Sequence, residues 1–486
     1  MLIETYKFTS EEIPITVNIT SKKGEFVNLY EMTVASISKN TELILEKIRQ
    51  ELSQEVELGA ADITDQKKGA VIKKRFEDTI RRLIIKYFPG VDPTTLTFLT
   101  SYLIQHSLGL GNLEILLDDK NLEEIAVNGA DQPVWVYHHK HGWLKTNITL
   151  KNEDQVKQYA NLIGRKVGRS ITLLAPLLDA QLETGERANA TLQPISTIGN
   201  TITIRKFKAK PYTITDFIQE GTATPQAAAL FWLAIQYELS VLVSGGTASG
   251  KTSALNAITG FIPPNQRVIS IEDTRELQLP SFMHWIPMLT RLPNVEGKGA
   301  VTMLDLLVNS LRMRPDRIIV GEIRRQNEAE VLFEAIHTGH SVYATVHADN
   351  VEETITRLIN PPINISKTLL PAISMITTMW RNRRTGIRRL LQIAEINKDS
   401  SASILMQRDI RTDKLNWIKN SKTLFPTLME QTGLNMQEVK QSLSEKVDIL
   451  KWLAKNNINT VDGVGKVMAN YYTNKNDLIS YITKNG

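Results

Sequence analysis

One stretch of the chain has the residue types and spacing needed to hold a phosphate group. It runs Ser244-Gly245-Gly246-Thr247-Ala248-Ser249-Gly250-Lys251-Thr252 and fits the pattern G-x-x-x-x-G-K-[ST]. Glycines let the backbone curl so that successive N–H groups point inward at phosphate oxygens. The lysine can reach the β- and γ-phosphates, and the threonine hydroxyl can bind Mg²⁺. The pattern predicts a nucleoside triphosphate site formed by Gly245, Gly246, Thr247, Ala248, Ser249, Gly250, Lys251 and Thr252.

The residues on either side of this loop favour the same interpretation. Leu239–Val243 is typical of a buried strand, and Ser253–Ile258 is typical of a helix. A helix that begins at the loop directs the positive end of its dipole at bound phosphate. The alternative is a chance glycine-rich turn, which a strand–loop–helix context makes rarer.

Two apolar segments later in the chain are each followed by acidic residues, at positions where a nucleotide site needs carboxylates. Val268–Ile271 is followed by Glu272 and Asp273, and Ile318–Val320 is followed by Gly321 and Glu322. Ligands of open α/β sheets bind at the carboxyl ends of the strands. Acidic residues at this edge can hold Mg²⁺, and they can orient or deprotonate water. We expect the Mg²⁺ ligands to be Thr252, Asp273 and Glu322. The sequence leaves open whether Glu272 or Glu322 is the general base. The alternative to a catalytic role is that these residues are exposed acids that happen to follow strands.

A histidine follows a third candidate strand. Ser341–Thr345 runs into Val346-His347-Ala348-Asp349. A lone histidine is more often structural, but this position beyond a strand end favours a role for His347 in sensing the γ-phosphate. We expect His337 and His340 to be packing or helix-end residues.

Composition excludes several classes of function. The chain has 486 residues, is 42% hydrophobic and 22% charged, and carries a net charge of +5. This slight positive balance does not by itself indicate nucleic acid, and weak attraction to an anionic membrane surface is equally compatible. Because there is no cysteine, disulfides, iron–sulfur clusters and cysteine-ligated zinc are excluded.

The sequence shows no targeting or membrane-spanning signal. The N-terminus lacks a basic region followed by an apolar one. No apolar run reaches the ~18 residues that span a bilayer, and the nearest, 368–376, is broken by Pro371. We therefore expect a cytoplasmic protein that meets a membrane through a partner.

Periodicity divides the chain into regions. Residues 1–110 are expected to be helical, with helices at 41–56, 72–88 and 93–108 and with Asp92 capping the last. Residues 111–207 alternate short strands, at 124–129, 133–137 and 202–205, with one helix at 153–167, which predicts an α+β domain. A linker at 208–212 precedes a parallel α/β domain at 213–395. The polar tail, 396–486, is expected to be an accessory region of mixed structure.

The order and spacing of these motifs resemble the type II/type IV secretion ATPase superfamily. The resemblance is carried by Gly245–Thr252, Glu272-Asp273, Gly321-Glu322 and the segment from Gly339-His340 to His347-Ala348. Upstream, Gly109–Glu114 followed by Glu123–Gly129 looks like the entry into the family's N-terminal domain. Tyr137–Ile148 is similar to the archaeal branch, which includes archaellum and archaeal pilus motors. The match covers roughly residues 109–395.

The resemblance implies a fold and a role for each matched residue. The fold is a RecA-like P-loop ATPase core with a preceding α+β (PAS-like) domain and a helical N-terminal region. Lys251 and Thr252 would be the Walker A pair, and Glu272 would prepare a water molecule for attack on the phosphate. Glu322 would act on Mg²⁺ from the Walker B position, and His347 would be the histidine-box residue. Arg187 and Arg205 would reach the nucleotide from the N-terminal domain, with Arg312 a further candidate. A structural ion pair is the alternative for each arginine.

The resemblance also implies a function. The protein would be a homo-hexameric motor that hydrolyses Mg²⁺-ATP at the inner face of the cell membrane. It would act on a polytopic platform protein, and indirectly on pilin-like subunits, during filament assembly or type II/IV secretion. The tetracysteine zinc site of many bacterial pilus relatives is absent, which favours the archaeal or conjugation-type branches. We expect neither zinc nor nucleic acid as a partner.

Two other classes of function compete with this one. A RecA-like nucleic-acid motor shares the phosphate loop, but the sequence shows no aromatic and basic stacking platform. A non-catalytic nucleotide-sensing assembly factor would not need the paired carboxylates Glu272 and Glu322. Nucleic-acid-stimulated turnover would favour the first, and any turnover excludes the second.

Overall fold

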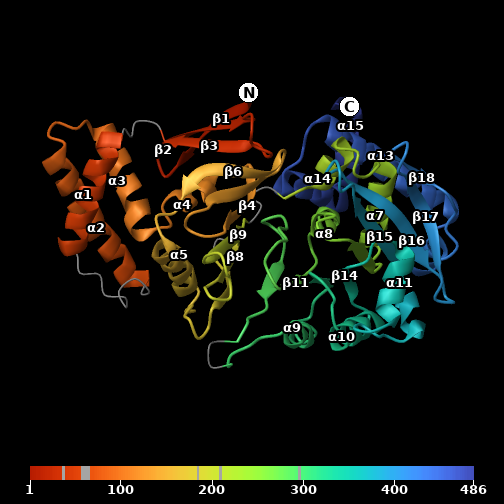
Figure 1. The fold of residues 1–486 in the computed structure, drawn as a ribbon. Coiled ribbons are helices and arrows are strands. Elements are labelled where there is room, and N and C mark those ends of the chain that lie inside the picture. The colour runs from red at the N-terminus through yellow and green to blue at the C-terminus, as the bar shows by residue number, and fades with distance from the viewer. Residues whose placement is uncertain (35–38, 56–65, 183–184, 207–210, 294–296, 486) are drawn as a thin grey trace. The chain divides into compact units, whose positions relative to one another are not determined.

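The computed structural model describes the chain outside residues 35–38, 56–65, 183–184, 207–210, 294–296 and 486. The chain forms two compact units, Met1–Ala209 and Lys210–Gly486 (Figure 1). The boundary between them falls within the predicted linker, 208–212, of which residues 208–210 lie outside the described residues.

The first unit is built on a nine-stranded sheet in the order β1-β2-β3-β6-β5-β4-β9-β8-β7. Neighbouring strands are antiparallel except β3 and β6, which are parallel. The strands are β1 (Leu2–Ser10), β2 (Ile13–Thr20), β3 (Leu29–Val34), β4 (Leu122–Val127), β5 (Pro133–His138), β6 (Gly142–Thr149), β7 (Leu177–Gln181), β8 (Arg187–Thr191) and β9 (Thr201–Arg205).

Five helices accompany this sheet: α1 (Lys39–Glu55), α2 (Gln66–Tyr87), α3 (Pro93–Leu108), α4 (Asn112–Asp118) and α5 (Glu153–Lys166). The first three pack against one another, as Figure 1 shows. The three predicted N-terminal helices are confirmed, and so is the cap, because the Asp92 side chain accepts a hydrogen bond from the Thr95 N–H at 3.0 Å.

Three strands that the sequence analysis did not predict precede these helices. In β2 the residues Ile13, Ile15, Val17 and Ile19 are buried and alternate with more exposed positions, as expected of a half-buried strand. Because β3 pairs with β6, the three strands β1, β2 and β3 extend the sheet that contains β4–β9. Residues 1–110 are therefore helical only from α1 onward, and they belong to the same compact unit as residues 111–207.

The second unit contains another nine-stranded sheet, ordered β12-β11-β13-β14-β10-β15-β16-β17-β18. The strands from β12 to β15 in this order are parallel, and the remaining pairs are antiparallel. The strands are β10 (Val241–Gly245), β11 (Val268–Glu272), β12 (Trp285–Leu289), β13 (Arg317–Val320), β14 (Ser341–Val346), β15 (Met375–Arg381), β16 (Arg388–Ile396), β17 (Ala402–Asp409) and β18 (Lys414–Trp417).

Helices cover both faces of this sheet. They are α6 (Ile214–Gln219), α7 (Pro225–Gln236), α8 (Lys251–Thr259), α9 (Met303–Ser310), α10 (Gln326–His337), α11 (Val351–Ile359), α12 (Leu424–Thr432), α13 (Met436–Lys455), α14 (Val461–Thr473), α15 (Lys475–Asn485) and the 3₁₀ helix η1 (Lys367–Ala372). Val241 and Val243 of β10 pack in one apolar cluster with α7 and α8, whereas Leu242 packs in a second with α9 and α10. The predicted parallel α/β core is confirmed.

The polar tail is part of this second unit. Strands β17 and β18 continue the sheet beyond β16, and α13 packs against α7. The end of the α/β domain expected at residue 395 therefore falls at the end of β16, inside a continuous sheet. Among the described residues, no helix is long and apolar enough to cross a membrane.

Candidate nucleotide-binding site

The parallel strands bring the predicted site residues to one edge of the second sheet. Strands β11, β13, β14 and β10 are consecutive neighbours in the sheet, and all run in the same direction. Glu272 ends β11, Glu322 follows β13, His347 follows β14 and Gly245 ends β10. The carboxyl ends of parallel strands meet at one edge, so four motifs far apart in sequence share this edge.

The loop after β10 needs its glycines. Gly245 and Gly250 have positive φ angles of 155° and 96°. A β-carbon on Gly245 would lie 2.4 Å from Ser249 Oγ, and one on Gly246 would lie 2.4 Å from Asp349 Oδ1. The sequence analysis gave Asp349 no role, although it lies two residues beyond His347. The loop has the tight curl that a phosphate cradle requires.

Lys251 lies folded over the loop. Its Nζ donates to the carbonyl oxygens of Gly245 and Gly246, at 2.9 and 3.1 Å, and lies 3.5 Å from His347 Nδ1. Burial lowers the pKa of Lys251, and the carboxylates of Glu322 and Asp349 oppose that shift. The structure thus brings His347 to the lysine of the phosphate loop, while the role of His347 in sensing phosphate stays a prediction.

Glu272 is the most buried acid of the site, with 2% of its surface exposed. Its Oε1 accepts hydrogen bonds from the N–H groups of Glu276 and Leu277, at 2.9 and 3.1 Å. Its Oε2 is buried and has no hydrogen-bond partner in the part of the chain that the structure describes. Burial raises the pKa of Glu272 to about 7, against the lowering effect of the two N–H groups. Such a carboxylate can accept a proton near neutral pH.

Glu322 and Asp273 are joined by an arginine that the sequence analysis did not select. Arg324 donates through Nε and Nη2 to Glu322 Oε2, at 2.9 and 2.6 Å, and through Nη1 to Asp273 Oδ2 at 2.5 Å. Thr290 donates to the other oxygen of Asp273 at 3.0 Å. The only signal for Arg324 in the sequence was its position two residues after Glu322.

The donor set at this edge suits a magnesium–phosphate complex. Thr252 stands in the first turn of α8 and offers a hydroxyl oxygen, and Glu322 offers a carboxylate; both are oxygen ligands that Mg²⁺ prefers. Asp273, the third predicted ligand, has both oxygens engaged by Thr290 and Arg324. Among the described residues, no three histidine or acidic side chains gather to hold a metal ion. Mg²⁺ would therefore be bound here together with phosphate oxygens, as is usual for this ion.

Two of the three predicted arginines belong to the first unit. Arg187 in β8 and Arg205 in β9 are directly paired across the two strands. Arg187 forms a two-point ion pair with Asp179, at 3.1 and 2.7 Å, and Arg205 lies opposite Glu124 of β4. Like charges paired across strands repel, so an anion bound near them would stabilise the pair. Their action on a nucleotide stays a prediction.

The third arginine, Arg312, is exposed and follows α9. Within the described residues it has no hydrogen bond or ion pair to the phosphate loop, to Glu272 or to Glu322. Its catalytic role also stays a prediction.

The fold and this edge define an α/β protein with a phosphate-loop motif at the carboxyl edge of a parallel sheet. Comparison with known proteins makes the assignment more specific. The model of the type II/IV secretion system protein family matches residues 107–409, well over half of the chain. The chain belongs to the type II/IV secretion system protein family.

Several proteins of known sequence are similar to this chain. An uncharacterized protein of Methanocaldococcus jannaschii is 40% identical over 299 residues, which cover 61% of this chain and 54% of the relative. A second from that organism is 37% identical, over 70% of this chain and 46% of the relative. The chain thus spans about half the length of these two relatives. The type IV secretion system protein PtlH of Bordetella pertussis is 31% identical over 50% of this chain and 77% of its own length.

Among solved structures, the VirB11 ATPase of the Brucella suis type IV secretion system is 25% identical. The match covers 59% of this chain and 94% of that one, with a TM-score of 0.31.

Proposed function

We propose that this protein hydrolyses Mg²⁺-ATP to drive type II/IV secretion or the assembly of a type IV pilus-like filament. The observation that carries the proposal is the position of a buried carboxylate, Glu272, at the same sheet edge as the phosphate loop and Lys251. The unpartnered Oε2 of Glu272 is a hydrogen-bond acceptor for which the described protein offers no donor, and a water molecule can supply one.

Each group at the edge has a distinct task in this reaction. The loop N–H groups and Lys251 bind the phosphates, and Lys251 exchanges its bonds to the loop carbonyls for bonds to phosphate oxygens. Mg²⁺, held by Thr252 and Glu322, would neutralise charge on the phosphates. Glu272 orients the attacking water and accepts its proton. Arg324 fixes the carboxylate of Glu322, and its charge adds to that of Lys251.

The motor assembly is also a proposal. We infer a homo-hexamer on the cytoplasmic face of the membrane that acts on a polytopic platform protein. In this assembly Arg187 and Arg205 act on the nucleotide, and the γ-phosphate sets the arrangement of the subunits. The support comes from the family to which the chain belongs and from the relative PtlH, which is named as a type IV secretion system protein.

Assembly and hydrolysis measured together test this function. We expect light scattering to show a hexamer when a non-hydrolysable ATP analogue is bound. We also expect steady ATP turnover that single-stranded nucleic acid does not change. A strict monomer with the analogue bound would contradict the ring. Turnover that rises many-fold with nucleic acid would instead identify a nucleic-acid motor.

A further inference from the structure

Ala248 is held in an uncommon backbone conformation inside the phosphate loop. Its φ is +57°, in the left-handed region that favours glycine and that a residue with a β-carbon adopts at an energetic cost. Such a residue persists only where its surroundings hold it in place. One residue in contact with Ala248 is Arg388, whose Nε donates a hydrogen bond to the Ala248 carbonyl at 2.9 Å.

Arg388 reaches the loop from β16, a strand of the antiparallel part of the sheet. Its Cδ lies 3.5 Å from the place where a β-carbon on Gly250 would stand. The stem of the side chain therefore lies beside Gly250 and its Nε beside the Ala248 carbonyl. The only hydrogen bond of the Arg388 side chain among the described residues is the one to Ala248.

The backbone of Arg388 is fixed by a cluster that we define as the buried Arg408, the partly buried Arg389 and the exposed Asp413. Arg408 is 3% exposed, and it donates to both the carbonyl and the carboxylate of Asp413, at 2.8 and 2.7 Å. It also donates to the carbonyl oxygens of Leu390, Gly221 and Thr222 at 2.8, 3.0 and 2.9 Å. These five bonds use all the donors that a guanidinium has.

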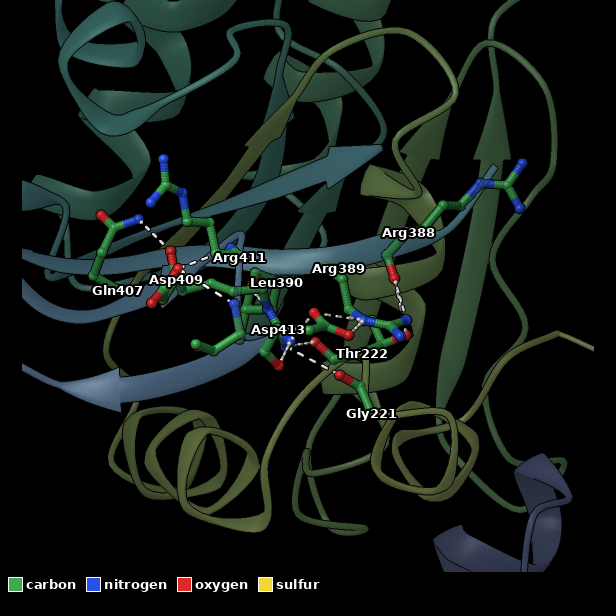
Figure 2. Close-up of polar contacts among 11 residues, drawn as sticks. Gly221, Thr222, Arg388, Arg389, Leu390, Gln407, Asp409, Arg411 and Asp413 are labelled. Atoms are coloured by element: carbon green, nitrogen blue, oxygen red, sulfur yellow. Dashed lines mark hydrogen bonds and ion pairs between the residues drawn. The ribbon is translucent and has the colours of Figure 1, made fainter. Parts of the chain in front are cut away.

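This cluster acts directly on the carbonyl of Arg388. Arg389 donates to that carbonyl at 3.0 Å while it also binds the Asp413 carboxylate, and the Thr222 hydroxyl donates to it at 3.3 Å. Figure 2 shows Arg389 directed toward Asp413 and Arg388 directed the opposite way, as expected for consecutive residues of a strand. Because the buried Arg408 has all its donors bonded, the hydrogen bonds around it hold the backbone from which the Arg388 side chain extends.

We propose that Arg388 is a positioning residue that holds the phosphate loop in its nucleotide-binding shape through the carbonyl of the left-handed Ala248. The Arg389–Arg408–Asp413 cluster anchors the strand from which it acts. The inference rests on the proposed function, because it concerns binding of phosphate by the same loop. It predicts that nucleotide affinity depends on a residue that need not touch the nucleotide.

The test measures the affinity of the full-length protein for a fluorescent ADP. Arg388→Met keeps the side-chain stem beside Gly250 and removes the donor, so we expect ADP to bind about tenfold more weakly with an unchanged melting temperature. Arg388→Lys, which keeps a donor, should recover part of the loss. Arg383→Met changes an exposed arginine of the adjoining turn and is the matched control, with wild-type affinity expected.

A second substitution separates positioning of the loop from direct contact with the nucleotide. Glycine adopts a positive φ without the cost that alanine has. Ala248→Gly in the Arg388→Met background should therefore restore most of the affinity. Wild-type affinity in Arg388→Met would overturn the inference, and so would a loss that Ala248→Gly does not restore.

Lys251→Ala distinguishes this failure from failure of the proposed function. If Arg388→Met binds normally while Lys251→Ala has lost ADP, Arg388 has no positioning role and the nucleotide site stands. If Lys251→Ala also binds ADP normally, the loop is not the nucleotide site, and both proposals fall.

Discussion

At the scale of single residues, the two glutamates of the site have different surroundings. Glu272 is buried and keeps one oxygen without a partner among the described residues, whereas Glu322 is partly exposed and is ion-paired with Arg324. A buried carboxylate with a raised pKa is suited to accept a proton, and a partly exposed carboxylate is suited to a metal ion. We therefore propose that Glu272 is the general base and that Glu322 holds Mg²⁺.

Replacing Glu322 tests the metal role. Glu322→Gln keeps the size of the side chain and removes the charge, so we expect ATP turnover to fall roughly 100-fold or more while ATP still binds. Phosphate release and fluorescent-nucleotide titration measure the two effects. Glu330→Gln, in the adjoining helix α10, is the matched control. Normal hydrolysis by Glu322→Gln would show that the metal is held elsewhere.

Replacing Glu272 tests the water-activating role. In Glu272→Gln the amide oxygen can still accept from the Glu276 and Leu277 N–H groups, so the local fold should persist. We expect turnover to fall by a factor of about 10²–10⁴ with nucleotide affinity changed little, as measured by the same two assays. A variant that turns over within twofold of wild type would exclude Glu272 as the base.

The sequence could predict some residues of this site and not others. The phosphate loop, Glu272, Glu322 and His347 carry their signal in local spacing and in their place after apolar runs. Arg388 carries none, because its contact with Ala248 spans 140 positions and depends on the pairing of β15 with β16. Arg324 and Asp349 likewise come to this site only when separate strand ends meet.

At the scale of elements, helix α13 carries a charge that the fold buries. The Lys446 side chain is fully buried, and its Nζ donates to Ser442 Oγ at 2.7 Å and to Tyr471 Oη at 3.0 Å. The same Nζ lies 5.4 Å from the ring centroid of Trp232 in α7. Burial lowers the pKa of Lys446 to about 7. Helix packing in this unit is thus coupled to pH.

The sign of that coupling follows from the two pKa values. An unfolded lysine titrates near ~10.4, so between about 7 and ~10 the unfolded chain binds more protons than the folded one, and stability rises with pH. Lys446→Met removes the cost of burying a charge. We expect it to raise the free energy of unfolding by roughly 1–3 kcal/mol at pH 7 and by less at pH 10.

Thermal unfolding at the two pH values measures this difference. Lys440→Met, an exposed position of the same helix, is the control and should change stability little at either pH. If Lys446→Met destabilises the protein equally at pH 7 and pH 10, the hydrogen bonds of Lys446 outweigh its burial cost.

The elements of the chain were predicted unevenly for a physical reason. The helices with strong periodicity or caps, and the apolar strands around the phosphate loop, were visible in sequence. Strand β2 alternates from Ile13 to Thr20 and could have been recognised by that period. The place of β17 and β18 in the second sheet could not, because a four-residue edge strand such as β18 owes its position to pairing with β17, which in turn pairs with β16.

At the scale of the whole molecule, we propose that Arg187 and Arg205 of the first unit act on the nucleotide bound by the second. ATP carries more charge than Lys251 and one Mg²⁺ neutralise, and two paired arginines in another unit could supply the rest. Arg187→Ala and Arg205→Ala should each slow hydrolysis about 10- to 100-fold while weakening ATP binding less.

Turnover and analogue-binding measurements on the two variants separate these effects. Arg165→Ala, at an exposed position of α5 in the same unit, is the matched control and should hydrolyse ATP normally. Undiminished turnover in both arginine variants would mean that the first unit takes no part in the chemistry, even if the phosphate loop is assigned correctly.

The central claim is that this chain hydrolyses ATP at the loop that contains Lys251. The most direct measurement is the rate of phosphate release from Mg²⁺-ATP by the wild-type protein and by Lys251→Ala. The Lys251 Nζ donates to loop carbonyls, and Lys251 is not a member of the apolar clusters described for this unit, so the variant should fold normally. We predict steady turnover by wild type and a loss of at least ~100-fold in the variant, with an unchanged melting temperature. A folded Lys251→Ala protein that releases phosphate at the wild-type rate would contradict the account.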